Sequence, residues 1–187
     1  MAQMVGSYIL QLCVAILLAL PFYLLIRKPW RIWSKREAAL AVFVLFMIGL
    51  LMLTLGIPRQ RPDAMFSEAI SRIRTGEGIN LVPFRSIGGY FRHYGYGELF
   101  LVNFWGNIIM FMPWGFGLVL LWKRKQHVHS VILHALGLTA FIELGQLFIG
   151  RSVDVDDLIL NFLGSCLGAG LYFLLRKIYS PISEFAR

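Results

Sequence analysis

Charged residues are scarce in this sequence of 187 residues. They make up 15% of the chain, whereas hydrophobic residues make up 58%. A soluble globular domain has about 25% charged and roughly 45 to 50% apolar residues. The mean hydropathy of +0.68 points the same way. These values exclude an ordinary soluble domain and predict an integral membrane protein.

Cysteine and the common catalytic motifs are also scarce. The two cysteines, Cys13 and Cys166, both lie in long apolar segments, which favours packing roles over a disulfide framework. The histidines do not have HExxH spacing, and no Walker loop, GxSxG elbow or dinucleotide fingerprint occurs. We therefore expect no zinc site, no cofactor and no soluble nucleotide chemistry.

Long apolar runs are what the sequence does contain. Five segments are apolar over the ~17 to 25 residues that a helix needs to cross a bilayer. They are residues 5–26, 38–57, 99–122, 130–149 and 158–175. The sequence therefore predicts an all-α, polytopic membrane bundle of about five transmembrane helices.

The basic residues follow every second predicted span. Clusters lie after the first, third and fifth spans, and every lysine belongs to one of them. Most of the ten acidic residues fall on the other side. By the positive-inside rule, the N-terminus lies outside and the C-terminus in the cytoplasm. The net charge of +8 thus reports topology rather than binding to nucleic acid.

This topology divides the chain into four parts. Residues 1–57 hold two N-terminal transmembrane helices, residues 58–98 form an extracytoplasmic loop, and residues 176–187 are a cytoplasmic tail. The three remaining spans follow the loop. Within the loop, apolar residues recur at helical spacing and predict a short interfacial helix. These residues are Met65, Phe66, Ala69, Ile70 and Ile73. The segment NLVPFRSIGGYF that follows predicts an ordered turn against the bundle.

Polar side chains gather where the last three spans approach the outer face. Four carboxylates lie between or within apolar runs, where each costs roughly 2.5 to 3.5 kcal/mol at the bilayer centre. At ~1.5 Å per helical residue, the polar positions of these spans share the outer half of the membrane. We therefore predict a polar cavity that opens outward. Its candidate residues are Asn103, Asn107, Glu143, Gln146, Arg151, Asp154, Asp157 and Asn161.

Structural roles compete with functional ones at these positions. The acidic run from Asp154 to Asp157 precedes an apolar helix, where carboxylates cap exposed N–H groups. Glu143 either forms a buried pair with Arg151 or Arg85, or serves a ligand or a proton. Arg151 equally suits an anionic phosphate or carboxylate. Gly164 and Gly168 form a GxxxG pair that favours close helix packing.

Three blocks of the sequence occur in the order NLVPFRSI, NFWGNIIMFMPWGFG and ELGQLFIGRSVDVDDLILNFLG. Together they resemble the VanZ-like membrane domain. The resemblance covers residues 80–175 and implies a domain with three transmembrane helices. The resemblance implies that the polar candidates are family motif positions, and that further motif positions have structural roles. The latter are Asn80, Pro83, Phe84, Pro113, Gly115 and Gly164.

The resemblance implies a multi-pass protein of the bacterial plasma membrane, associated with resistance to teicoplanin-type glycopeptide antibiotics. We expect a non-catalytic factor whose polar cavity engages membrane lipids, a lipoglycopeptide antibiotic or a lipid-linked envelope precursor. Two alternatives remain open. One is an intramembrane enzyme acting on an envelope lipid or lipid-linked glycan, with a carboxylate as base, Arg151 holding an anion and magnesium at the aspartates. The other is a small proton-coupled transporter or flippase that uses Glu143.

Overall fold

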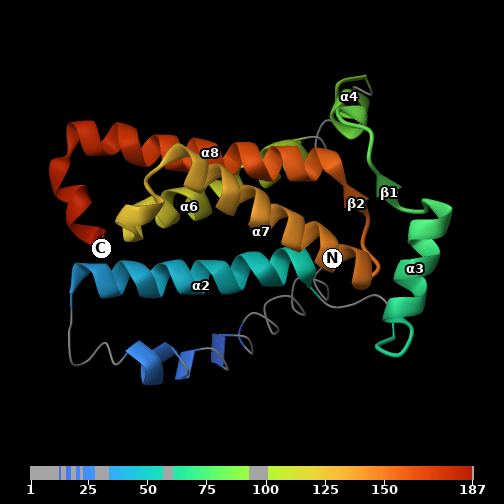
Figure 1. Cartoon of the computed structure of the whole chain (residues 1–187), viewed down its shortest axis with the longest axis horizontal. Helices are drawn as coiled ribbons and strands as arrows, with labels where there is room; N and C mark the ends of the chain where they lie inside the picture. Colours follow the sequence, from blue (N-terminus) through green and yellow to red (C-terminus); the bar gives the residue numbers. More distant parts are fainter. Residues whose placement is uncertain are drawn as a thin grey trace.

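The computed structural model describes residues 34–56, 61–92 and 101–186, together with some positions between 13 and 27. The first predicted span, residues 5–26, therefore lies largely outside the described residues. Where the chain is described, it is helical apart from short connections and two strands of two residues each. Figure 1 shows the long helices side by side, with the shorter elements across one end of the bundle.

Four helices in the described ranges are long and apolar enough to cross a membrane. Helix α2 spans Lys35–Leu55, α7 spans Val128–Phe148 and α8 spans Val155–Ile178. The fourth begins as a π-helical turn, Leu101–Trp105, and continues as α6, Gly106–Leu121. They match the predicted spans from the second to the fifth, so this is a multi-pass membrane protein. A fifth span and the orientation of the termini stay predictions.

Helix α8 packs closely against α6 through small residues. A Cβ atom on Gly164 would lie 2.2 Å from the carbonyl oxygen of Ile108, and one on Gly168 would lie 1.9 Å from that of Met112. Real Cβ atoms do not approach a backbone oxygen this closely, so only glycine fits at both positions. The packing role predicted from the GxxxG spacing is confirmed.

The two ends of the bundle differ in charge. At the end we call the basic end, α2 begins, α6 and α8 end, and a 3₁₀ turn, Lys123–Lys125, connects α6 to α7. The acidic end is the opposite one, where α8 begins with its aspartates (Figure 1). The basic residues placed at the basic end are Arg27, Lys35, Arg36, Lys123, Arg124, Lys125, Arg176 and Lys177. This separation is the one expected for a protein oriented by the positive-inside rule.

Helix α3, Met65–Thr75, lies across the acidic end, roughly perpendicular to the long helices (Figure 1). Its Ala69 is buried, whereas Phe66, Ile70 and Ile73 are exposed. The Phe66 ring contacts that of Phe148 on α7, with centroids 5.4 Å apart. The predicted helix is therefore present, and its position at the membrane interface stays a prediction.

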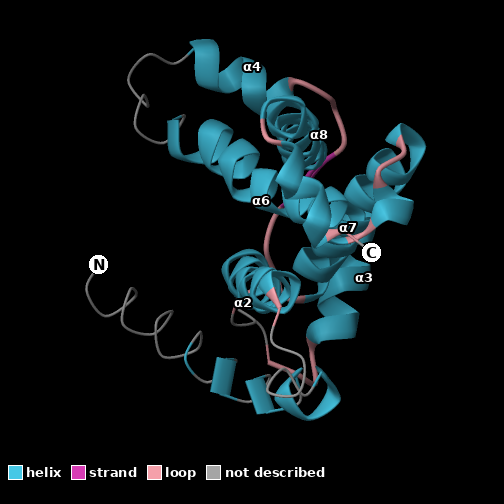
Figure 2. Cartoon of the chain, turned by 90° about the vertical axis from the view of Figure 1, so that its left-hand side faces the viewer, coloured by secondary structure: helices cyan, strands magenta, loops and turns pink. Residues whose placement is uncertain are grey.

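A short parallel pairing joins the loop after α3 to the loop before α8. Strand β1, Ile79–Asn80, pairs with β2, Val153–Asp154, and Asn80 lies opposite Asp154. The two strands, magenta in Figure 2, lie next to the start of α8. After β1 the chain turns and forms α4, Arg85–Arg92. The segment predicted as one ordered turn is thus a strand, a turn and a helix.

Candidate functional site

The strand pairing places Asp154 among hydrogen-bond donors from both loops. Its Oδ1 accepts from Asn80 Nδ2 at 2.8 Å, and its Oδ2 accepts from Ser86 Oγ at 2.5 Å. Oδ1 also accepts from the backbone N–H of Asp156 at 2.9 Å, so Asp154 is the N-cap of α8. The capping role predicted for one of these aspartates belongs to Asp154, which also ties the two loops together.

Asp156 caps a different helix. It is only 1% exposed and accepts three backbone N–H groups at the start of α4. These donors are Phe84 at 2.5 Å, Ser86 at 2.8 Å and Ile87 at 3.0 Å. Phe84 has φ of +64°, a left-handed conformation that is unfavourable for a bulky residue. The buried carboxylate therefore holds a strained turn in place, a role that the sequence analysis missed.

Gln146 and Arg151 serve the end of α2. The Gln146 side chain donates from Nε2 to the carbonyl oxygen of Thr54 at 3.1 Å. Arg151 donates from Nη1 to the same oxygen at 2.8 Å and to that of Leu53 at 3.1 Å. Both side chains thus satisfy carbonyls that the last turn of a helix leaves unpaired.

Arg72 does the same for α7 and was not among the predicted residues. Its Nη1 donates to the Leu147 carbonyl oxygen at 3.2 Å, and its Nη2 to that of Arg151 at 2.6 Å. It also bonds the carbonyls of Glu77 and Gly78 in its own loop. The periodicity of α3 marks Arg72 only as a residue on the polar side, which is also true of its neighbours.

Asn107 and Asp157 meet between α6 and α8. The Asn107 side chain donates from Nδ2 to Asp157 Oδ1 at 2.7 Å, and both residues are partly buried. Asn103 lies one helical turn earlier, in the π-helical segment, and is exposed. The polar stripe predicted on this span therefore reaches the bundle interior at Asn107.

Glu143 has no cationic partner of the expected kind. It is 5% exposed, and its Oε2 accepts from the backbone N–H of Asp154 at 3.1 Å. Its Oε1 is buried and has no hydrogen-bond partner within the described part of the chain. Among the described residues, which include Arg85 and Arg151, neither arginine forms an ion pair with Glu143. Of the alternatives that the sequence left open, the pair with Arg151 does not form, because Arg151 is directed to α2.

Asn161 on α8 is also a buried residue with an unpaired side-chain oxygen among the described residues. It is 3% exposed, and its Oδ1 has no partner among the groups that the structure describes. Asn161 follows Asp157 by one helical turn on α8, so both lie on the same face. Asp154 and Asp157 are also near enough to Glu143 to interact with it electrostatically. The acidic end therefore contains more buried acceptors than donors, an arrangement suited to binding a hydrogen-bond donor or a cation.

The family motif positions outside this cluster have visible structural roles. Gly115 approaches α8 so closely that a Cβ atom would lie 1.8 Å from the Ser165 carbonyl oxygen. Pro113 lines an apolar groove of about 350 Å³ between α2 and α6. Pro83 and Phe84 are exposed at the acidic end.

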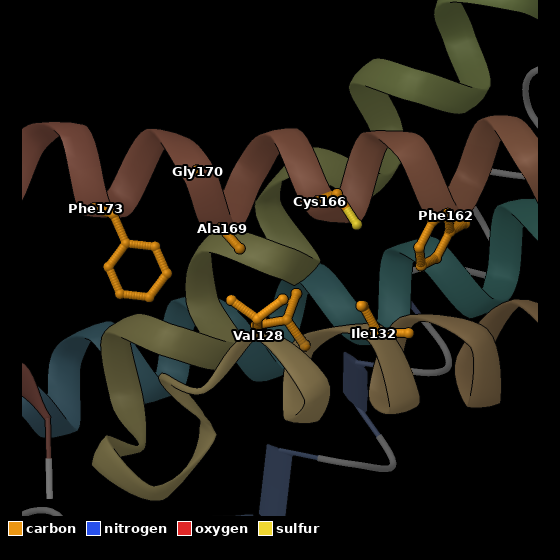
Figure 3. A pocket seen from close by; sticks show the side chains of 8 residues that line it. Val128, Ile132, Phe162, Cys166, Ala169, Gly170 and Phe173 are labelled. Atoms are coloured by element: carbon orange, nitrogen blue, oxygen red, sulfur yellow. The ribbon is translucent and has the colours of Figure 1, made fainter.

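A second apolar groove lies between α7 and α8 and has a volume of about 260 Å³. Figure 3 shows Phe162, Cys166 and Phe173 of α8 facing Val128 and Ile132 of α7. Cys166 is partly buried there and forms no disulfide. Neither groove contains any of the eight polar candidates, so the polar cluster and the apolar grooves are separate features of the bundle.

Comparison with known protein families gave one finding. A family model described as VanZ/LLP1 matches residues 41–176. This range includes most of α2, all of α6 and α7, and α8 except its last two residues, and it extends beyond the resemblance seen at residues 80–175. No curated protein and no solved structure matches the chain.

Proposed function

Because this chain belongs to the VanZ/LLP1 family, we propose that it acts in the bacterial plasma membrane as a non-catalytic factor that engages an amphiphile. The amphiphile is a teicoplanin-type lipoglycopeptide or the envelope lipid with which it competes. Binding takes place at the acidic end, in the outer leaflet. Its consequence is tolerance of glycopeptide antibiotics.

The unpaired Glu143 oxygen is the observation that carries this proposal. A carboxylate that is 5% exposed in an apolar bundle is costly, and one without a full set of partners is more so. A purely structural role would be served by pairing both oxygens. An oxygen left without a donor is instead what a site awaiting a ligand requires.

Exposed apolar residues at the same end support an amphiphilic ligand. Leu81, Val82 and Phe84 of the β1–α4 turn project into the surroundings, and α3 exposes three further apolar side chains. Soluble surfaces seldom gather so many large apolar residues. At a membrane interface they contact acyl chains, which places apolar surface beside the polar cluster.

The position of Arg151 favours binding over the enzymatic alternative. That alternative depends on Arg151 to steady an anionic group. Its Nη1 is committed to two backbone carbonyls at the end of α2. Moving it to a phosphate would break both bonds, so the Leu53 carbonyl would lose this donor and the Thr54 carbonyl would keep that of Gln146.

Antibiotic tolerance tests the proposal. The full chain and its Glu143→Ala and Asp157→Asn variants are expressed in a susceptible bacterium, and the membrane abundance of each is measured by immunoblot. Glu68→Ala is the matched control, because Glu68 is an exposed carboxylate on α3 at the same end. We expect teicoplanin tolerance with the unmodified chain and the control, and its loss in both other variants at equal abundance. Equal tolerance in all four strains, or none with the unmodified chain, contradicts the proposal.

A further inference from the structure

Two buried oxygen acceptors at the acidic end receive no hydrogen bond from the residues that the structure describes. One is Oε1 of Glu143 on α7 and the other is Oδ1 of Asn161 on α8. Both side chains are more than nine-tenths buried. Native proteins satisfy most buried polar atoms, because an unsatisfied one loses its bonds to water without replacement. Two in the same region therefore need an explanation.

The donors nearby are already committed. Asn107 donates to Asp157, Gln146 and Arg151 donate to the end of α2, and Arg72 donates to the end of α7. Withdrawing one of them to reach Glu143 would break a hydrogen bond that it already makes, to Asp157 or to a carbonyl at the end of α2 or α7. Among the described residues no donor reaches these two oxygens, so a ligand can supply one.

The charge around these oxygens is negative. Glu143 lies beside the N-cap of α8, close to the carboxylates of Asp154 and Asp157. Asp156 adds a further carboxylate in the same turn, although three N–H groups surround it. The only cation close enough to act on Glu143 electrostatically is Arg151, within the described residues. Such a field repels an anion and attracts a cation.

From the unpaired oxygens, the committed donors and this field, we propose that Glu143 and Asn161 bind the primary ammonium group of an amphiphile. An ammonium group has three N–H donors and one positive charge, so its chemistry matches oxygen acceptors in a negative field. A phosphate group has neither property. This inference rests on the proposed function and deepens it, because it names the head-group chemistry that the site selects.

The test uses the purified full chain in detergent and native mass spectrometry. Three probes share one dodecyl tail: dodecylammonium, dodecyltrimethylammonium and dodecyl phosphate. The trimethyl probe keeps the charge and removes every N–H donor. We expect dodecylammonium to bind most tightly, at least about 10-fold above the trimethyl probe, because charged hydrogen bonds are lost.

Two variants locate the site. Glu143→Gln keeps an oxygen for the Asp154 N–H but removes the charge, and Asn161→Leu removes the second acceptor at similar volume. Both should bind dodecylammonium roughly 10- to 100-fold more weakly. Glu68→Gln, with the same chemical change at an exposed position, should bind as the unmodified chain does. If Glu143→Gln does not fold, the binding of dodecylammonium by Asn161→Leu still tests the site.

Two further arms identify the source of the amine. Phosphatidylethanolamine and its N-acetylated form are compared, as are the lipid-bearing antibiotic and its N-acetylated form. Preference for either free amine supports the inference and names its source. Equal binding of free and blocked amines, preference for dodecyl phosphate, or unchanged binding in both variants overturns it. In those cases amphiphile binding itself survives, whereas a chain that binds none of the probes loses the proposed function as well.

Discussion

Replacing Asp156 by asparagine should release α4 from the bundle while leaving the long helices in place. The Asp156 carboxylate is 1% exposed and accepts the backbone N–H groups of Phe84, Ser86 and Ile87. Its Oδ2 receives two of these bonds. In asparagine one of the two oxygens becomes an NH₂ group, which cannot accept them.

The magnitude follows from the lost bonds. A hydrogen bond to a charged group contributes about 1.5–3 kcal/mol and a neutral one about 0.5–1.5 kcal/mol, so losing one bond and the charge on the other two weakens the local structure by about 3–6 kcal/mol. The left-handed Phe84 adds to this loss, because its strain persists only while its surroundings hold it. Amide exchange in residues 81–92 should therefore accelerate by roughly 10²- to 10⁴-fold.

Hydrogen exchange with mass spectrometry measures this directly on the protein in detergent or nanodiscs. Peptides from α6, α7 and the middle of α8 should exchange as before, since local opening need not involve the whole bundle. Asp63→Asn is the control, because Asp63 is exposed and pairs only with Arg61 at the surface. Unchanged exchange at residues 84–87 in Asp156→Asn would refute the capping role.

Three further predictions concern the packing and the caps. Gly168→Ala should lower the free energy of unfolding by about 1–3 kcal/mol or more, seen as a lower thermal midpoint, because the added Cβ meets a backbone oxygen. Gly170→Ala, whose added Cβ meets nothing within 4 Å among the described residues, should leave the midpoint unchanged or raise it. Arg72→Ala should lower the free energy of unfolding by about 2–4 kcal/mol and accelerate amide exchange at the end of α7. Arg74→Ala, at an exposed position on the same helix, should change the free energy of unfolding by less than ~0.5 kcal/mol. Asn107→Leu should lower the free energy of unfolding by about 1.5–3 kcal/mol, because the half-buried Asp157 carboxylate on α8 loses its amide donor. An unchanged thermal midpoint would show that this bond does not stabilise the fold.

The long helices and α3 were predictable because each is set by local physics. An apolar run of sufficient length must form a helix in a bilayer, since no water is present there to satisfy the backbone. Helix α3 follows from the spacing of its apolar residues, and the α6–α8 contact follows from the GxxxG pair of Gly164 and Gly168. These features depend on residues within a few turns of one another.

The partners of the polar residues depended on the tertiary structure. Arg151 was predicted to hold Glu143 or an anion, yet it donates to a carbonyl oxygen 97 residues away, at Thr54. Asp156 accepts N–H groups about 70 residues away. The sequence alone determined the helical spans and that polar groups gather at one end. Only the fold decided which of these groups cap helices and which remain unpaired, because the partners are backbone atoms, which every residue carries and no side-chain pattern distinguishes.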